Sequence, residues 1–495
     1  MAASILTHGS KAADVLYRYA RPQVKIDLAG QTDNLTATFT TGDRIEGTVT
    51  ISSAHLISFD ELQIQLEGCQ TVSVEQGMVP GRSGATQTFL RMRQPIDDSL
   101  YPTPRVLEPG STHQFPFTFV VPQRLLPHVC SHHKVNAHVH DSHTLLLPSM
   151  GDPILASDGQ SVLDDMSPDM ACVTYHVRAE VLQKPVVPGP AKSLRFARKK
   201  VRIVPAVEEE PPLTVRDNDH VYRNRREKDV RRGTMRPRQG RLVMAASQPR
   251  PLQLRPPSKS SESVSTAATI HLRFDPDGDE KPPTLGTVWS KLRSATYYSA
   301  HPWDDYPTAS VVSPGAVSGR GVYHDSVPLS NMCVASAQWT KQTADSLVRR
   351  DSLLSTASAE SIPGPSASYS GDTYYTASIV VPVSLPANKA FLPTFHSCLI
   401  SRLYFLELSV SYHTPNMNIL TPTVSLKLPI QLTFRPSTAG ASSRRPSEEI
   451  TQQEVDAEFF SPRSVGPTDP TTAPPDYTDF SSPLPNTWPQ EVQCS

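Results

Sequence analysis

The sequence predicts an all-β chain with two β-sandwich domains, and three observations carry that prediction. Hydrophobic and polar residues alternate with a period of two in several separate segments, which is typical of strands with one buried face. Turn-forming residues separate these segments, and no long segment has the 3.6-residue period of an amphipathic helix. The 495-residue chain also contains 48 prolines, which fit poorly inside helices and central strands.

The first predicted sandwich spans residues 20–184. Turn signals at Thr41-Gly42-Asp43 and Glu108-Pro109-Gly110-Ser111 separate its predicted strands. The alternating segments are Arg44–Ile51, Leu62–Glu67, Phe115–Val121 and Val173–Val181. Several short strands joined by polar turns favour a sandwich over other β architectures.

A basic connector is expected over residues 185–239, and a second sandwich over 240–436. The strands expected in the second sandwich are Leu242–Leu254, Ala268–Phe274, Thr373–Leu385, Leu403–Tyr412 and Val424–Phe434. Pro429 in the last segment indicates an edge strand, because proline cannot donate a ladder hydrogen bond. Residues of about 304–372 are rich in Ser, Ala, Gly and Pro, a composition that predicts a disordered insertion.

The alternation stops after Pro436, and residues 437–495 are expected to form an acidic, disordered tail. Its residues 441–495 hold nine Asp or Glu and three Arg. The tail contains the peptide Pro474-Pro475-Asp476-Tyr477. Adjacent prolines favour the polyproline II conformation, which an aromatic-lined WW-domain groove can bind. We therefore predict that Pro474, Pro475 and Tyr477 are WW-domain contacts, with Tyr477 as a second anchor.

Basic residues are concentrated between Tyr222 and Arg241, where eight Arg and one Lys face two acidic residues. The candidate anion or phosphate contacts there are Arg223, Arg225, Arg226, Arg231 and Arg232. Such a run can bind phosphoinositide headgroups of anionic lipids or phosphorylated segments. It can equally be a solvated linker. A nucleic-acid partner is not expected, because aromatic residues are not interleaved with the basic ones.

Two serines follow paired arginines in the segments predicted to be disordered. They are Ser352 after Arg349-Arg350 and Ser447 after Arg444-Arg445. Phosphorylation would add negative charge there and could create a docking site. We therefore name Ser352 and Ser447 as candidate phosphorylation sites.

The span His128–His143 is rich in residue types that ligate metals, including Cys130 and six histidines. A zinc site usually needs four converging ligands, often from two separated pairs. Because all candidates crowd one loop, we expect a polar loop with no metal and no other cofactor. Local motifs of hydrolases, nucleotide-binding loops and metalloproteases are absent from the sequence, so no catalytic residues are predicted. The alternative hypothesis is that the protein is a metal-dependent enzyme whose metal is bound by this histidine-rich loop.

The sequence predicts a cytoplasmic protein. Its six cysteines are scattered, which favours reduced thiols in the cytosol. The first residues lack the features of a signal peptide, and no run of about 18 apolar residues is present. The net charge of −1 indicates no overall attraction to nucleic acid or membrane.

An ordered set of segments resembles the alpha-arrestins. The first half contains VKIDL, LEPGSTHQFPFTFVVP, LLPHVCSHH and YHVRAEVL, and the second contains GRLVMAASQPRPLQL, ATIHLRFDP, LYFLELSVSYHTP and VSLKLPIQLTF. Together they cover most of residues 20–436. This resemblance implies two tandem arrestin-like, immunoglobulin-like β-sandwich domains. The 304–372 insertion departs from a compact arrestin domain.

The same resemblance implies a trafficking adaptor. Such an adaptor binds an integral membrane cargo protein, such as a transporter or receptor, at the plasma membrane and endosomes. It recruits a HECT-type ubiquitin ligase through WW domains and thereby promotes endocytosis. Arg178 lies where related arrestins keep a phosphate-sensing arginine. The alternative function is a signalling scaffold arrestin that binds phosphorylated receptors or kinases without recruiting a ligase.

Overall fold

The computed structural model describes twelve stretches of the chain, and all of them fall within one compact unit, Met1–Ser437. The stretches are residues 21–31, 36–75, 82–156, 163–185, 189–215, 219, 221–231, 237–255, 264–312, 319–343, 362–413 and 421–435. Their secondary structure is nearly all β, which confirms the predicted fold class.

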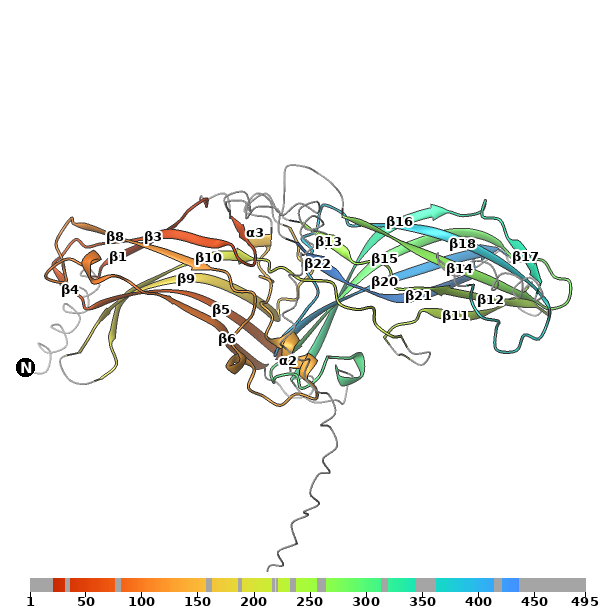
Figure 1. The fold of residues 1–495 in the computed structure, drawn as a ribbon, viewed down its shortest axis with the longest axis horizontal. Coiled ribbons are helices and arrows are strands. Elements are labelled where there is room, and N and C mark those ends of the chain that lie inside the picture. Colours follow the sequence, from red (N-terminus) through yellow and green to blue (C-terminus); the bar gives the residue numbers. More distant parts are fainter. Residues whose placement is uncertain are drawn as a thin grey trace, which may run out of the picture. The chain divides into compact units, whose positions relative to one another are not determined.

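The strands before residue 204 form one group of sheets. They are β1 (Gln23–Leu28), β2 (Thr38–Phe39), β3 (Arg44–Ser52), β4 (Ile57–Ser58), β5 (Glu61–Glu75), β6 (Arg82–Gln94), β7 (Val106–Leu107), β8 (Thr112–Val120), β9 (Ala171–Gln183) and β10 (Lys192–Ile203). One sheet has the order β1-β3-β8 and the other β2-β10-β9-β5-β6, while β4 pairs with β7. Figure 1 shows β5, β6 and β9 as long strands running side by side.

One hydrophobic core lies between these sheets. Ile45 on β3 and Phe115 on β8 are buried from one sheet, and Ile64 on β5 and Tyr175 on β9 from the other. The period-two patterns therefore place their apolar face inward, as expected. Gly68 permits close packing on β5, because a Cβ there would lie 2.7–2.8 Å from ring atoms of Phe89 and Tyr175.

The later strands form a second group of sheets. They are β11 (Arg225–Arg231), β12 (Arg238–Ala246), β13 (Leu252–Leu254), β14 (Ser265–Pro276), β15 (Thr284–Ser299), β16 (Arg320–Cys333), β17 (Thr340–Thr343), β18 (Thr373–Ser384), β19 (Phe395–His396), β20 (Ile400–His413), β21 (Thr423–Ile430) and β22 (Leu432–Phe434). One sheet has the order β11-β12-β14-β18-β17 and another β16-β15-β20-β19, while β13 pairs with β22.

The second hydrophobic core is enclosed by these two larger sheets. Leu272 on β14 and Val381 on β18 are buried from one side, and Leu292 on β15 and Leu406 on β20 from the other. Among the described residues β21 pairs with β20 on one side, and on its other side an isolated bridge joins Lys427 to Arg223. Pro429 therefore lies on a strand at the edge of this sheet, as predicted.

The basic connector expected over 185–239 is corrected by the structure. It contains β10, which pairs with β9 in the first group, and β11, which pairs with β12 in the second. Half of the β10 residues are exposed, and its buried residues are confined to Val201–Ile203. In β11 only Val230 is buried. Both are strands with little apolar content, so their composition resembled that of a linker.

The disordered insertion expected over about 304–372 is also wrong for its described parts. β16 pairs along its length with β15, and β17 pairs with β18. Val327 is the buried apolar residue of β16, and its other residues are half-buried or exposed. This edge strand therefore lacks the clean alternation that indicates a strand. Residues 313–318 and 344–361 lie outside the described part.

Short helices occupy the loops. They are the α-helices α2 (Ala137–His143) and α3 (Pro153–Ala156), and the 3-10 helices η1 (Asp98–Leu100), η2 (Pro127–Cys130) and η3 (Ala309–Val312). None of the helices in the described stretches has the length and apolar content needed to cross a bilayer. The first core also takes in Tyr298, Phe395 and Leu399 from the later strands. Segments after residue 240 therefore pack against the first core.

Candidate functional site

Several predicted site residues lie outside the described part of the chain. These are the WW-domain contacts, the candidate phosphorylation sites and one of the connector arginines, namely Pro474, Pro475, Tyr477, Ser352, Ser447 and Arg232. Their assignments stay predictions from the sequence.

Arg178 lies on the outer face of β9, in the middle of the five-stranded sheet. Its Nη2 is 2.7 Å from Glu180 Oε2, and its Nη1 is 4.0 Å from Glu67 Oε1. The guanidinium also lies 5.4 Å from the ring centre of Phe196. The contact with Glu67 was not identified from the sequence, because Glu67 is on another strand. An incoming phosphate would have to displace Glu180 to bind Arg178.

Glu67 is the centre of this polar cluster, and only 4% of its surface is exposed. Its carboxylate lies 3.0 Å from His176 Nε2 and 3.3 Å from Arg91 Nε. Burial lowers the pKa of His176, and the hydrogen bond to Glu67 opposes that shift only in part. The folded protein therefore favours the neutral form of His176.

The arginines of the connector differ in how strongly other residues of the chain hold their side chains. Arg225 is held by Glu227 at 2.8 Å and by the carbonyl oxygen of Pro365 at 2.9 Å. Arg231 lies 3.9 Å from Asp229, a weak contact. Arg223 and Arg226 have exposed side chains. An anionic partner would therefore meet Arg223, Arg226 and Arg231 before Arg225.

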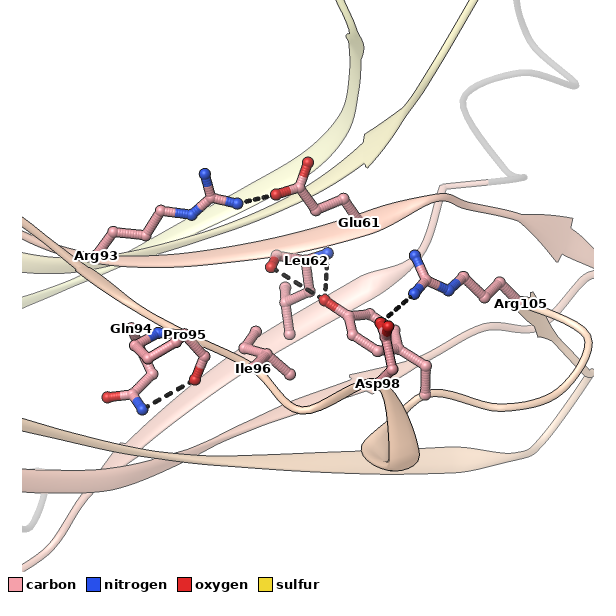
Figure 2. A pocket seen from close by; sticks show the side chains of 9 residues that line it. Glu61, Leu62, Arg93, Gln94, Pro95, Ile96, Asp98 and Arg105 are labelled. Atoms are coloured by element: carbon pink, nitrogen blue, oxygen red, sulfur yellow. Dashed lines mark hydrogen bonds and ion pairs between the residues drawn. The ribbon is translucent and has the colours of Figure 1, made fainter.

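A cavity of about 600 Å³ opens at one end of the first sandwich (Figure 2). Glu61 forms an ion pair with Arg93, and Asp98 lies 2.6 Å from Arg105. The Tyr101 hydroxyl accepts a hydrogen bond from the Leu62 amide at 3.3 Å. The charged side chains that line this cavity are therefore paired with one another. Their arrangement does not indicate a reaction.

A larger groove of about 840 Å³ joins α2 to the second group of strands. Its lining is mainly apolar and aromatic, with Tyr222, Tyr306 and His396 among the rings. The Tyr306 hydroxyl lies 2.8 Å from Ser142 Oγ, and its ring meets His396 edge-on. This groove could not be predicted from the sequence, because its lining residues come from segments far apart in the chain.

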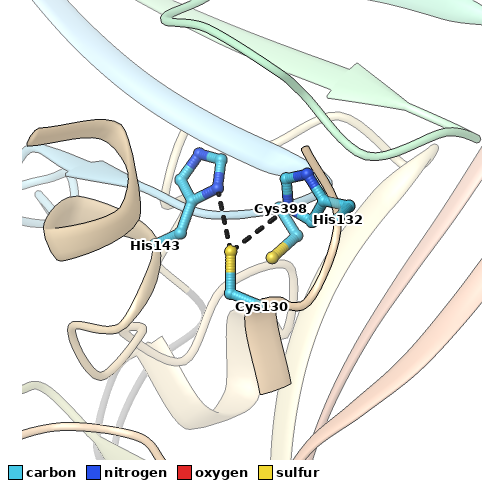
Figure 3. A group of neighbouring side chains, drawn as sticks. All are labelled: Cys130, His132, His143 and Cys398. Atoms are coloured by element: carbon cyan, nitrogen blue, oxygen red, sulfur yellow. Dashed lines mark hydrogen bonds between the residues drawn. The ribbon is translucent and has the colours of Figure 1, made fainter. Parts of the chain in front are cut away.

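The histidine-rich loop folds around three of its own side chains and one cysteine from elsewhere. Cys130 at the end of η2, His132 just after it and His143 at the end of α2 converge with Cys398, as Figure 3 shows. Cys398 lies between β19 and β20, so local spacing could not reveal it. Burial raises the pKa of the Cys398 thiol and lowers that of His143 to about 3. His128, His133, His138 and His140 are not part of this cluster.

Comparisons with known proteins do not assign the chain to a family. No family model matches the sequence, and no curated protein matches it. Any function must therefore be inferred from the residues and their arrangement.

Proposed function

We propose that the protein is an alpha-arrestin-like trafficking adaptor that brings a WW-domain HECT-type ubiquitin ligase to an integral membrane cargo protein. The observation that carries this proposal is the peptide Pro474-Pro475-Asp476-Tyr477, which follows the β-sandwich region in an acidic tail. Ubiquitination of the cargo would then promote its endocytosis.

The tail peptide would supply the contact with the ligase. Two adjacent prolines hold the backbone near the polyproline II conformation, so little entropy is lost on binding. The proline rings would lie in the aromatic groove of a WW domain, and the Tyr477 ring would occupy a neighbouring site. Asp476 lies between these anchors and has no required contact.

The β-sandwich region would supply the contact with the membrane and its cargo. Arg223, Arg226 and Arg231 are exposed on or beside the edge strand β11. Their guanidinium groups could bind the phosphates of anionic lipids when the protein is recruited from the cytoplasm to the plasma membrane or endosomes.

Titration of WW domains with a peptide of residues 470–482 tests the ligase contact. We expect binding that is lost in the Tyr477→Ala peptide, because the second anchor is removed. The matched control is Asp476→Ala, which should bind like the natural peptide. Binding that survives Tyr477→Ala would remove the basis of the proposal.

A signalling scaffold is the second candidate, and the ion pair of Arg178 with Glu180 favours it. A phosphorylated receptor or kinase segment could compete with Glu180 for the Arg178 guanidinium. The two functions differ in their need for the tail. Deletion of residues 441–495 should stop cargo turnover by a ligase adaptor, whereas a scaffold should keep its partners.

A further inference from the structure

We propose that Cys130, His132, His143 and Cys398 form a structural zinc site. One potential ligand atom from each side chain lies within 4.8 Å of all the others. The set combines two thiols with two imidazoles, which is a common ligand set of structural zinc. This inference concerns the stability of the β-sandwich region and does not depend on ligase recruitment.

The measured separations fit tetrahedral coordination. Zinc bonds of about 2.3 Å to sulfur and 2.0–2.1 Å to nitrogen place a sulfur and a nitrogen ligand about 3.5 Å apart. Cys130 Sγ lies 3.2 Å from His132 Nε2 and 3.6 Å from His143 Nδ1. These two separations match those around a zinc ion, and all other separations among the four ligand atoms are within 4.8 Å.

The hydrogen bonds of His132 suit its role as a ligand. Its Nδ1 lies 2.9 Å from the carbonyl oxygen of His133, which can only accept. Nδ1 must therefore carry the proton, and Nε2 presents its lone pair towards Cys130 and the centre of the cluster (Figure 3). A backbone acceptor on the second ring nitrogen is a frequent companion of zinc-bound histidine.

The burial of three of the four side chains, with His132 half-buried, indicates a closed, structural site. The exposed fractions of Cys130, His143 and Cys398 are 1%, 1% and 2%. With four protein ligands the coordination of zinc is complete, so no position remains for a substrate or an activated water. Two thiols favour zinc over magnesium or calcium, which prefer oxygen ligands.

Regular elements and tight turns hold the ligands in place. Cys130 ends η2, and His143 ends α2, whose first turn is capped by the Asn136 side chain. The turn at Cys398 is fixed by Ser397 Oγ, which accepts a hydrogen bond from the Ile400 amide at 3.1 Å. The amide of Trp303 donates to the carbonyl oxygen of Cys398 at 2.9 Å.

A chain of buried polar side chains joins the two cysteine-bearing segments. Ser397 Oγ donates to Gln70 Oε1 at 2.8 Å, and Gln70 Nε2 donates to Gln87 Oε1 at 2.7 Å. Gln87 Nε2 in turn donates to the carbonyl oxygen of Val129 at 2.8 Å, next to Cys130. The first sandwich thus fixes both cysteines through β5 and β6, and zinc would cross-link them.

Metal analysis of the full chain, purified with a thiol reductant and dialysed against zinc and then buffer, tests the site. We expect one zinc per chain. Cobalt(II) replacement should give the visible spectrum of a tetrahedral ion with thiolate-to-cobalt charge transfer. Substoichiometric zinc, a cobalt spectrum without the thiolate band, or a Cys130–Cys398 disulfide in place of metal would overturn the proposal.

Cysteine variants locate the metal. Cys130→Ser and Cys398→Ser should each lose stoichiometric zinc, whereas Cys333→Ser, which removes an exposed cysteine of β16, should retain it. If either ligand variant fails to fold, removal of zinc from the natural chain by a chelator replaces it. We expect the melting temperature to fall on chelation and to recover with zinc. Zinc that is retained by both ligand variants, or lost without any change in melting temperature, would contradict a structural site here.

Discussion

At the scale of single residues, the buried tyrosines differ in what their hydroxyl groups contact. The Tyr175 hydroxyl donates to the carbonyl oxygen of Leu147 at 2.5 Å, and burial raises the pKa of Tyr175 well above its usual value. Tyr374 is equally buried, and its hydroxyl has no partner among the described residues. The sequence predicted an inward-facing Tyr175 from its alternation. It could not predict the acceptor, because Leu147 lies in a loop without a pattern.

Tyr175→Phe should lower the free energy of unfolding by about 1–3 kcal/mol, because a buried carbonyl loses its donor. Tyr374→Phe is the matched control, because it removes a buried hydroxyl that has no hydrogen-bond partner among the described residues. We expect a change near zero, or a slight gain, for that variant. Urea denaturation followed by tryptophan fluorescence measures both, and equal losses would contradict the hydrogen-bond assignment.

His176 should make stability depend on pH. Its pKa in the folded protein is lowered from 6.5, chiefly by burial, so folding favours the neutral ring. The stabilisation is complete above the unfolded pKa and is lost as the pH falls through the lowered pKa. His176→Gln should therefore weaken the decline in the free energy of unfolding below pH 6.5.

The direction of the His176 pKa shift can be checked by measuring unfolding free energies across this pH range and by an NMR titration of the His176 ring. The control is His55→Gln, which removes an exposed histidine. A folded pKa of His176 above 6.5 would show that the Glu67 contact outweighs burial.

At the scale of elements, strands with one apolar face were predictable and strands with charged faces were not. The segments Val173–Val181 and Val424–Phe434 alternate cleanly, and the structure places strands over both. β10 and β11 were missed because most of their side chains face solvent or one another. β15 was missed although it is central, because the polar residues Ser290 and Ser294 lie on its buried face and hide a period of two.

Residues 362–372 show how polar contacts order a segment of low hydrophobicity. Arg273 and Asp275 form a buried ion pair on β14, with Nε 2.7 Å from Oδ1. Asp275 Oδ2 accepts the amide of Ser366 at 2.7 Å, and Arg273 donates to the carbonyl oxygen of Pro363 at 3.4 Å. Because both partners come from another strand, composition alone predicted disorder here.

Arg273→Met should lower the free energy of unfolding by about 3–5 kcal/mol, because it leaves the Asp275 carboxylate buried without its partner. The double variant Arg273→Met/Asp275→Leu should lose less than the single variant. Chemical denaturation of both proteins tests the pair, and a double variant at least as unstable as the single would argue against the ion-pair explanation.

At the scale of the whole chain, the most informative contacts join segments far apart in the sequence. Arg402 on β20 is fully buried and donates to the carbonyl oxygens of Asp165 and Met166 at 3.1 and 3.2 Å. Cys398 likewise completes the cluster begun by Cys130 and the histidines. The histidine-rich loop could be recognised from the sequence, but its fourth ligand could not, because no local pattern links the two segments.

The tail motif differs from these features because it can be recognised from adjacent residues in the sequence alone. Pro474, Pro475 and Tyr477 form a short motif whose binding mode follows from the properties of proline and tyrosine. The fold indicates that the chain before it is built of β-sandwich sheets. Adaptor function requires both parts to act in one molecule, so the deciding measurement must use the full chain.

Affinity purification of the full chain from cells, with Tyr477 intact or changed to Ala, is that measurement. We expect the natural chain and Asp476→Ala to recover a WW-domain HECT ligase together with a ubiquitinated membrane protein. Tyr477→Ala should recover the membrane protein without the ligase and with less ubiquitin attached. Equal recovery of the ligase by the Tyr477→Ala and natural chains would contradict ligase recruitment through the tail motif.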